Sequence, residues 1–209
     1  MIGPSSSHTA GAVRIGKVAR MILGEQPKEA LIHLYGSFAK TYKGHGTDKA
    51  IIGGLLGFEV DDIRIKDSFE IAKANGIKFT FDERDDDNFH PNTASIEVKA
   101  KDGRTSGITA SSIGGGNIII NRIDNVPVDF NCQLFTIVIQ HKDIPGIISA
   151  ITDILAQANI NIAFMKVFRK SKGNDAITVI ETDQSAQSET VERIEKLESV
   201  QNARFIQPI

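Results

Sequence analysis

The sequence has a single cysteine, Cys132, and no tryptophan among its 209 residues. A lone cysteine cannot form a disulfide within the chain, and one thiolate is too few to hold a structural zinc ion or an iron–sulfur cluster. Long apolar runs are also absent, because charged residues interrupt them well before the ~20 residues that cross a bilayer. The N-terminus lacks the basic and apolar segments of a signal peptide. We therefore expect a cytoplasmic protein without a membrane span, in which any metal is held mainly by another chain.

Neither sign of charge dominates, since 24 Lys and Arg oppose 26 Asp and Glu and leave a formal charge of -2. Without a strong positive field, binding to nucleic acid or to acidic lipid is not expected. The composition, 41% hydrophobic and 24% charged, is typical of a folded globular protein. At roughly 150 residues per domain, this length favours two small domains. The turn formers of Asp124–Asp129 predict a boundary that separates residues 1–128 from residues 129–209.

The second domain is predicted to have the element order βαββαβ. The run Leu134–Ile139 is rich in β-branched and aromatic residues, as in a buried strand, and the apolar residues of Ile147–Ala158 recur on one helical face. The remaining elements are a strand that opens near Asn161, a hairpin turn at Lys172–Asp175, a strand at Ala176–Ile180, a helix from Ser188 and a strand at Val200–Ile206. This order places two helices on one face of a four-stranded antiparallel sheet.

The first domain is predicted to be a mixed α/β sandwich, so that the whole chain has an α+β fold. The expected helices cover Ala10–Leu23, Asp48–Leu56 and Lys66–Asn75. The expected strands cover Ala30–Tyr35, Ile77–Phe81, Ala94–Ala100, Thr105–Ile113 and Asn117–Ile123.

The segment Ser5–Thr9 concentrates hydroxyl groups and an imidazole just before the first predicted helix. Unpaired N–H groups and the positive end of the dipole make a helix start suitable for a carboxylate or a phosphate. Ser6, Ser7 and Thr9 could add hydrogen-bond donors, and His8 could exchange a proton near neutral pH. The alternative is a simple helix cap, but a cap needs one hydroxyl rather than four.

Two further clusters are candidates of the same kind. In Tyr42–Asp48, His45 lies between two glycines that would let backbone approach a ligand, although a turn capped by Thr47 or Asp48 explains the segment equally well. In His90–Thr93, a proline-stiffened turn presents an imidazole and an amide together, or is only a loop. His33 and His141 are expected to serve structure or to face solvent.

The strand-to-helix turn of the second domain, Asp143–Gly146, together with Asn161 at the next strand, resembles an ACT domain. Such domains pair side by side and often bind an amino acid near that turn. The resemblance implies a homodimer and an effector site that includes Asp143, Gly146 and Asn161. The alternative is that Pro145 and Gly146 only shape a tight turn and that the domain only dimerises.

Most of the chain resembles the β chain of bacterial iron–sulfur-dependent L-serine dehydratases. The resemblance rests on five segments: Met1–Gly11, Tyr35–Ala39, Tyr42–Asp48, His90–Thr93 and Ser112–Gly116. It implies deamination of L-serine to pyruvate and ammonia. We expect two classes of site residue: catalytic histidines His8 and His90, either of which assists proton movement or orients a ligand, and substrate-binding residues Ser6, Ser7, Thr9, His45, Asp48, Asn92 and Thr93.

The resemblance further implies a [4Fe-4S] cluster that cysteines of a separate α chain hold and that acts as a Lewis acid on the serine oxygens. The lone cysteine of this chain agrees with that division, and no metal ligand is expected here. A heteromer with the α chain follows, as does an α2β2 assembly if the ACT domains pair. The alternative function is a non-catalytic module that binds an amino acid for regulation and dimerisation, because the first domain also looks like an allosteric domain of some phosphoglycerate dehydrogenases.

Overall fold

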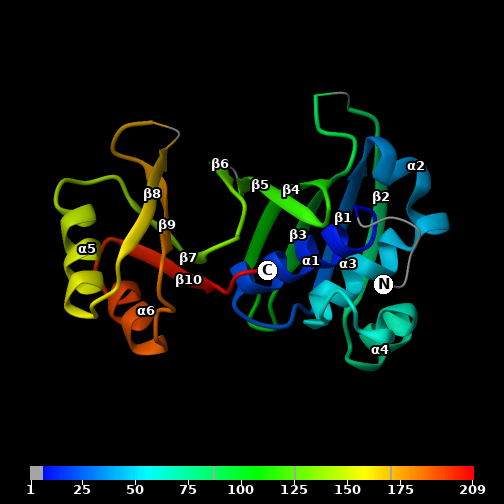
Figure 1. The fold of residues 1–209 in the computed structure, drawn as a ribbon, viewed down its shortest axis with the longest axis horizontal. Helices are drawn as coiled ribbons and strands as arrows, with labels where there is room; N and C mark the ends of the chain where they lie inside the picture. The colour runs from blue at the N-terminus through cyan, green and yellow to red at the C-terminus, as the bar shows by residue number, and fades with distance from the viewer. Residues whose placement is uncertain (1–6, 87, 125, 170) are drawn as a thin grey trace. The chain divides into compact units, whose positions relative to one another are not determined.

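The computed structural model describes residues 7–86, 88–124, 126–169 and 171–209. The chain forms two compact units, residues 1–125 and 126–209 (Figure 1). The helical elements of the first unit are α1 (Ala10–Leu23), α2 (Gly36–His45), α3 (Thr47–Leu56), the 3₁₀ helix η1 (Ile63–Asp67) and α4 (Ser68–Ala74). Its strands are β1 (Glu29–Tyr35), β2 (Lys78–Arg84), β3 (Thr93–Lys99), β4 (Thr105–Gly114) and β5 (Asn117–Ile123).

The strands of the first unit follow the order β2-β1-β3-β4-β5. β1 and β2 are parallel, and the other neighbouring pairs are antiparallel. Along β1, the buried residues Ala30, Ile32 and Leu34 alternate with residues on the opposite face, as the period of a strand requires. The helices cover the buried face, where α1 contacts β3, β4 and β5 while α2 contacts β1 and β2. This arrangement confirms the predicted α+β class.

Helices α1 and α3 approach each other closely where both carry glycine. A Cβ built on Gly16 would lie 2.2 Å from the carbonyl oxygen of Ile51, and one built on Gly54 would lie 2.1 Å from that of Val13. Both distances are far shorter than van der Waals contact, so each position accepts only glycine at this helix spacing. The backbones of α1 and α3 therefore touch, and this contact sets the position of the first turn of α1 relative to the first turn of α3.

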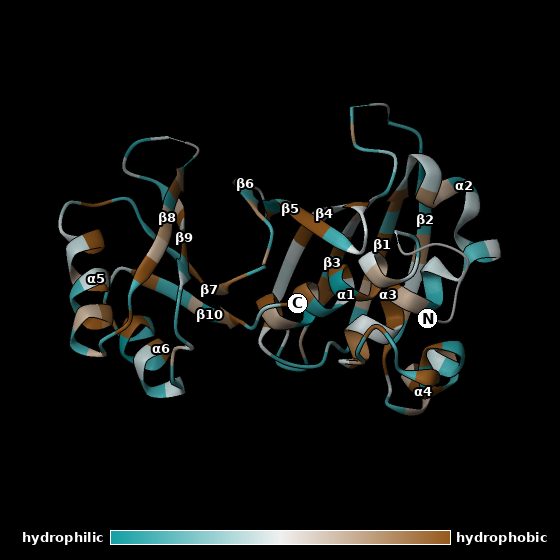
Figure 2. Ribbon diagram, in the orientation of Figure 1, coloured by the Kyte–Doolittle hydropathy of each residue, from teal (hydrophilic) through white to brown (hydrophobic). Residues whose placement is uncertain are grey.

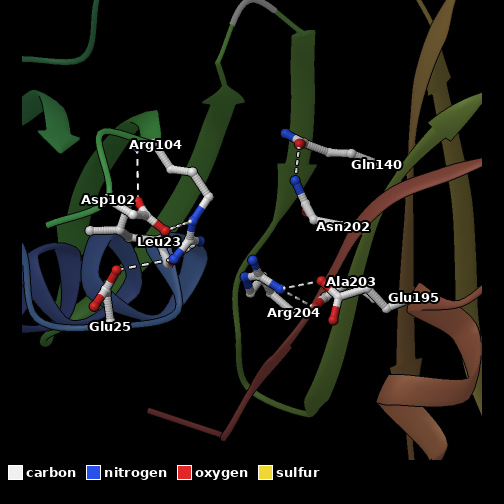
Figure 3. Close-up of polar contacts among 9 residues, drawn as sticks. All are labelled: Leu23, Glu25, Asp102, Arg104, Gln140, Glu195, Asn202, Ala203 and Arg204. Atoms are coloured by element: carbon white, nitrogen blue, oxygen red, sulfur yellow. Dashed lines mark hydrogen bonds and ion pairs between the residues drawn. The ribbon is translucent and has the colours of Figure 1, made fainter. Parts of the chain in front are cut away.

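The C-terminal end of α1 is held from the turn between β3 and β4. Arg104 donates from Nε to Asp102 Oδ2 (2.7 Å), from Nη2 to Glu25 Oε1 (3.0 Å) and from Nη1 to the carbonyl oxygen of Leu23 (3.3 Å; Figure 3). A cation at this end also complements the helix dipole. The contacts tie α1 to the sheet at the end opposite to Thr9.

The helices of the first unit differ from the expectation in two places. Most of the predicted helix Lys66–Asn75 is confirmed as α4, but the helical segment starts earlier, as the 3₁₀ helix Ile63–Asp67, because the side chain of Asp62 accepts the N–H of Arg64 and starts a tighter turn. The glycine-flanked segment around His45 is not a loop. Most of it belongs to α2, which begins at Gly36 and ends at Gly46 in the left-handed conformation (φ 70°).

The second unit contains β6 (Val126–Phe130), β7 (Phe135–Lys142), α5 (Ile147–Gln157), β8 (Ile162–Arg169), β9 (Asp175–Thr182), α6 (Ser188–Glu195) and β10 (Val200–Ile206). Four of these strands form an antiparallel sheet in the order β10-β7-β9-β8, which confirms the predicted βαββαβ arrangement. Its core joins apolar residues of the sheet to those of both helices, and Figure 2 shows that α5 and α6 also carry hydrophilic residues. From β10, Asn202 donates to Gln140 and Arg204 donates to Glu195 (Figure 3).

The segment predicted as the boundary is not wholly turn, because Val126–Phe130 forms strand β6 with alternating buried and exposed residues. Within the second unit, β6 contacts β8 and β9, and Lys166 on β8 pairs with Asp129 (3.4 Å). The division between the units falls after residue 125, whereas the sequence analysis places it after residue 128. No helix among the described residues has the length and apolar character needed to span a membrane.

Candidate functional site

The segment before α1 is described from Ser7 onward, so Ser5 and Ser6 lie outside the described residues. Thr9 occupies the N-cap position and is 2% exposed, yet its side chain makes no cap hydrogen bond to the helix. Its Oγ1 is buried and has no hydrogen-bond partner. Thr9 therefore does not act as the simple side-chain cap that was the alternative to a binding site.

His8 lies against residues from α2. Its Nε2 is 3.1 Å from Ser37 Oγ, and its ring centroid is 5.4 Å from that of Phe38 in an edge-on arrangement and 4.9 Å from that of His45. Burial, and secondly the charge of His45, lower the pKa of His8 below its ordinary value. His8 is therefore neutral at pH 7 and can accept a proton.

The proximity of His8 and His45 follows from the crossing of α1 and α3. His8 lies two positions before the first residue of α1, and His45, the last residue of α2, lies two positions before the first residue of α3. At the other end of the two helices, Arg20 Nη1 donates to the carbonyl oxygen of Leu55 (3.1 Å). The two helices thus run in the same direction and start side by side. The N-terminal ends of α1 and α3, and with them the positive ends of both helix dipoles, therefore lie close together.

The first residues of α3 are buried and polar. Thr47 is 0% exposed, and its Oγ1 has no hydrogen-bond partner. The buried Nδ1 of His45 also has no hydrogen-bond partner. Asp48 is 8% exposed, and its carboxylate accepts the N–H of Lys49 (2.8 Å). Burial raises the pKa of Asp48. The start of α3 therefore offers a hydroxyl and an imidazole nitrogen for a ligand, beside a carboxyl that burial favours in its neutral form.

The loop His90–Thr93 lies against the start of α2 and the end of β4. Thr93 Oγ1 donates to the carbonyl oxygen of His90 (2.7 Å) and lies 2.8 Å from Ser111 Oγ, while the backbone N–H of Ser112 donates to the carbonyl oxygen of Asn92 (2.9 Å). His90 is exposed and its Nδ1 accepts the N–H of Asn92 (3.2 Å). The side chain of Thr93 thus holds the loop together rather than facing a ligand.

Buried polar atoms without a partner are concentrated in these motifs. The described part of the chain has six buried side-chain nitrogen or oxygen atoms that lack a hydrogen bond. Five belong to the motifs that the resemblance rests on: Thr9 Oγ1, His45 Nδ1, Thr47 Oγ1, Asn92 Oδ1 and Ser112 Oγ. Buried polar groups in native proteins are almost always paired, so such a concentration indicates a place where a ligand or another chain supplies the partners.

Ser37 and Ser112 are two residues of the site that could not be recognised from the sequence. Both stand in segments quoted for the family resemblance, but a serine at a helix start or in a strand carries no signal of what it faces. A Cβ built on Gly11 would lie 2.1 Å from Ser112 Oγ, so β4 and α1 touch at this serine. Only the tertiary structure brings Ser37 to His8 and Ser112 to α1.

In the second unit, the three predicted effector residues do not meet within one chain. Asp143 accepts Arg169 Nη1 (2.8 Å) at the end of β8, and this hydrogen bond lowers the pKa of Asp143. Asn161 precedes β8 and donates to Asp183 (2.5 Å). Eight residues of strand separate the two places by about 26 Å. Gly146, with φ of 90°, precedes α5 on the Asp143 side.

The histidines set aside in the sequence analysis have clear structural roles. His141 is 1% exposed and its Nε2 lies 2.7 Å from Thr178 Oγ1, so it is a core residue and does not face solvent. His33 lies on the sheet face opposite to the helices and pairs with Asp82 (3.1 Å).

The residues of this chain do not fit an iron–sulfur cluster. Cys132 is fully buried, and burial raises the pKa of its thiol, which opposes the thiolate that a cluster needs. Within residues 7–86, 88–124, 126–169 and 171–209, no three histidine, cysteine, aspartate or glutamate side chains are grouped so that they could hold a metal ion. A cluster would need ligands from another chain.

Comparisons with known proteins agree with the motifs. The sequence model of the family described as "Serine dehydratase beta chain" matches residues 1–77, and that of "ACT domain" matches residues 135–199. The chain is 46% identical over 185 residues to a "Probable L-serine dehydratase, beta chain" of Bacillus subtilis (strain 168), covering 88% of this chain and 84% of the relative. It is 40% identical over 184 residues to an "L-serine dehydratase, beta chain" of Peptoniphilus asaccharolyticus, covering 88% and 83%. A "D-3-phosphoglycerate dehydrogenase" of Bacillus subtilis (strain 168) is 28% identical over 93% of this chain but only 37% of the relative.

Proposed function

The chain belongs to the family of L-serine dehydratase beta chains, and from this premise we propose how it contributes to the conversion of L-serine to pyruvate and ammonia. The observation that carries the proposal is the convergence of two helix starts, α1 and α3, on His8 and His45, whose rings are 4.9 Å apart. Unpartnered hydroxyls of Thr9 and Thr47 border the same place. An amino-acid substrate would supply the missing partners.

The carboxylate of L-serine binds where the two helices begin. The N-terminal N–H groups and dipoles of these helices favour an anion, and the hydroxyls of Ser7, Thr9 and Thr47 can donate to it. Ser6, which lies outside the described residues, is proposed as a further donor on the sequence alone. Asp48 lies at the same helix start, where a nearby substrate ammonium would favour its charged form. This places both charged groups of the substrate at one end of the helix pair.

His8 assists proton movement in this proposal. Because its pKa is lowered, the imidazole is neutral at pH 7 and can accept a proton from a nearby substrate group. His90 is exposed on its loop, and its Nδ1 accepts the N–H of Asn92. In this proposal His90 lies at the rim of the site. Asn92 supplies an unpartnered Oδ1 from the same loop.

The partner in the reaction is the alpha chain, which we propose holds the [4Fe-4S] cluster. The fully buried Cys132 supports this division, because this chain then contributes binding and proton transfer but no cluster ligand. A lone buried thiol also suits the reducing cytoplasm, where we place the enzyme.

We further propose that the second unit forms a homodimer through β8. This strand is at the edge of its sheet, and Phe164, Met165 and Val167 are 61%, 39% and 43% exposed. Unpaired edge strands are templates for pairing. An antiparallel β8 pair would bring Asn161 of one copy to the Asp143–Gly146 turn of the other, which is where an amino-acid effector would bind. Val167→Lys should reduce the mass measured by sedimentation to that of a monomer, and an unchanged mass would contradict the pairing.

The catalytic role is tested by variants reconstituted anaerobically with the alpha chain. His8→Ala should lower kcat/KM by about 100-fold or more, since general acid–base groups contribute on this order. His90→Ala is measured in parallel. His33→Ala, which removes a histidine from the opposite face of the sheet, is the matched control and should retain activity. Unchanged kcat/KM in both His8→Ala and His90→Ala would remove these loops from the active site and favour the non-catalytic regulatory module.

A further inference from the structure

Ser37, in the first turn of α2, lies against the imidazole of His8. Its Oγ lies 3.1 Å from His8 Nε2, although the two residues are 29 positions apart in the sequence. A hydroxyl can either donate to this nitrogen or accept from it, so the contact is compatible with both neutral tautomers. In either case it fixes the rotation of the imidazole.

The backbone around Ser37 is anchored on both sides. Gly36 has φ of 54°, and a Cβ built on it would lie 2.7 Å from Pro91 Cα, so the loop His90–Thr93 packs directly on this glycine. On the other side, the N–H of Phe38 donates to the carbonyl oxygen of Pro91 (3.1 Å), and Phe38 is 0% exposed. The Ser37 hydroxyl therefore projects from a turn that has little freedom to move.

His8 is restrained by three groups that act in different ways. The Phe38 ring lies edge-on to the His8 ring, and the His45 ring lies tilted against it. These ring contacts limit the position of the His8 ring but only weakly determine its rotation. The hydrogen bond to Ser37 is directional and resists that rotation. Because it engages Nε2, the hydrogen bond to Ser37 determines which way the imidazole ring is turned.

We propose that Ser37 is a positioning residue, which orients the His8 imidazole for proton transfer and couples it to the His90–Thr93 loop through the first turn of α2. The proposal rests on the catalytic role of His8 proposed above. Misplacing a catalytic group by about 1 Å can cost about 100-fold in rate. Loss of the Ser37 hydroxyl should thus affect kcat more than KM.

The test uses Ser37→Ala in the anaerobically reconstituted complex, with Ser37→Thr to restore the hydroxyl. The matched control is Thr41→Val, which removes a hydroxyl one turn later in α2 that donates to the Ser37 carbonyl (2.7 Å). We expect kcat of Ser37→Ala to fall by about 10- to 100-fold with KM within about twofold, the Ser37→Thr variant to recover activity, and Thr41→Val to resemble the wild type.

Two further measurements separate positioning from general damage. The double variant with His8→Ala should be no slower than His8→Ala alone, because Ser37 acts through His8. Histidine side-chain NMR of the full chain should show a changed His8 tautomer population and titration in Ser37→Ala but not in Thr41→Val. A wild-type kcat in Ser37→Ala, or unchanged His8 resonances, overturns the proposal while an impaired His8→Ala leaves the proposed function standing. An active His8→Ala would overturn both this proposal and the proton-transfer role of His8 on which it rests.

Discussion

The closeness of α1 and α3 at Gly54 can be tested by adding one methyl group. In Gly54→Ala the new Cβ would lie 2.1 Å from the carbonyl oxygen of Val13 and 2.7 Å from the backbone nitrogen of Lys17. Both are backbone atoms, so the helices must separate by roughly 1 Å rather than let a side chain turn aside. Overpacking of this kind costs about 3 kcal/mol, and alanine returns about 1 kcal/mol through helix propensity, which leaves a net loss of about 2 kcal/mol.

Gly53→Ala is the matched control, because it gains the same helix propensity on the same helix. Its Cβ would lie 3.2 Å from Ile65 Cγ1 and 3.5 Å from Phe58 Cδ2, which are side-chain rather than backbone atoms and can adjust. We expect little change in its stability. The two variants are compared by urea unfolding followed by circular dichroism, and hydrogen exchange of α1 amides assigns the change to the first unit.

Gly54→Ala should also lower kcat/KM in the reconstituted enzyme, because separating the helices moves the starts of α1 and α3 apart. The contact between His8 and His45 would then be lost or lengthened. Equal unfolding midpoints and equal kcat/KM for Gly54→Ala and Gly53→Ala would refute the argument that this crossing sets the geometry of the site.

Three other predictions follow from the charges of the first unit. Burial raises the pKa of Asp48 above the value of about 3.9 for unfolded aspartate, so its charged form costs stability as pH rises through the raised pKa. Asp48→Asn should therefore raise the urea midpoint at pH 7, and the gain should vanish below about pH 4. His45→Ala should raise the pKa of His8 toward about 6.5 in NMR titrations, because the burial of His8 is reduced and the electrostatic repulsion from His45 is removed; a further decrease would contradict this. Arg104→Ala should change the urea midpoint little, since its ion pairs are exposed, but it should speed hydrogen exchange in the last turn of α1. Arg64→Ala, which removes an exposed pair with Asp62, should not speed this exchange.

The strands and most helices could be predicted because their signals are local. Alternation of buried Ala30, Ile32 and Leu34 with the residues between them is visible in the sequence of β1, and the apolar face of α5 is equally plain. Helix α2 was missed because Gly36, Gly44 and Gly46 suggest a loop. In the structure, position 36 must be glycine because Pro91 packs directly on it, and position 46 favours glycine because its φ is positive. These glycines therefore shape the two ends of α2 and do not prevent the helix.

The motifs of the candidate site could be found in the sequence, but not the way they are combined. His8 and His45 are 37 positions apart, and what brings their rings together is the glycine contact between α1 and α3, which no local pattern reveals. The same contact aligns the buried hydroxyls of Thr9 and Thr47 at two adjacent helix starts. A sequence can show that a segment is rich in groups suited to binding. Whether those groups are already paired with each other, or left for a ligand, depends on distances that only the packed helices determine, and here five of the six unpaired buried atoms in the described residues fall within these motifs.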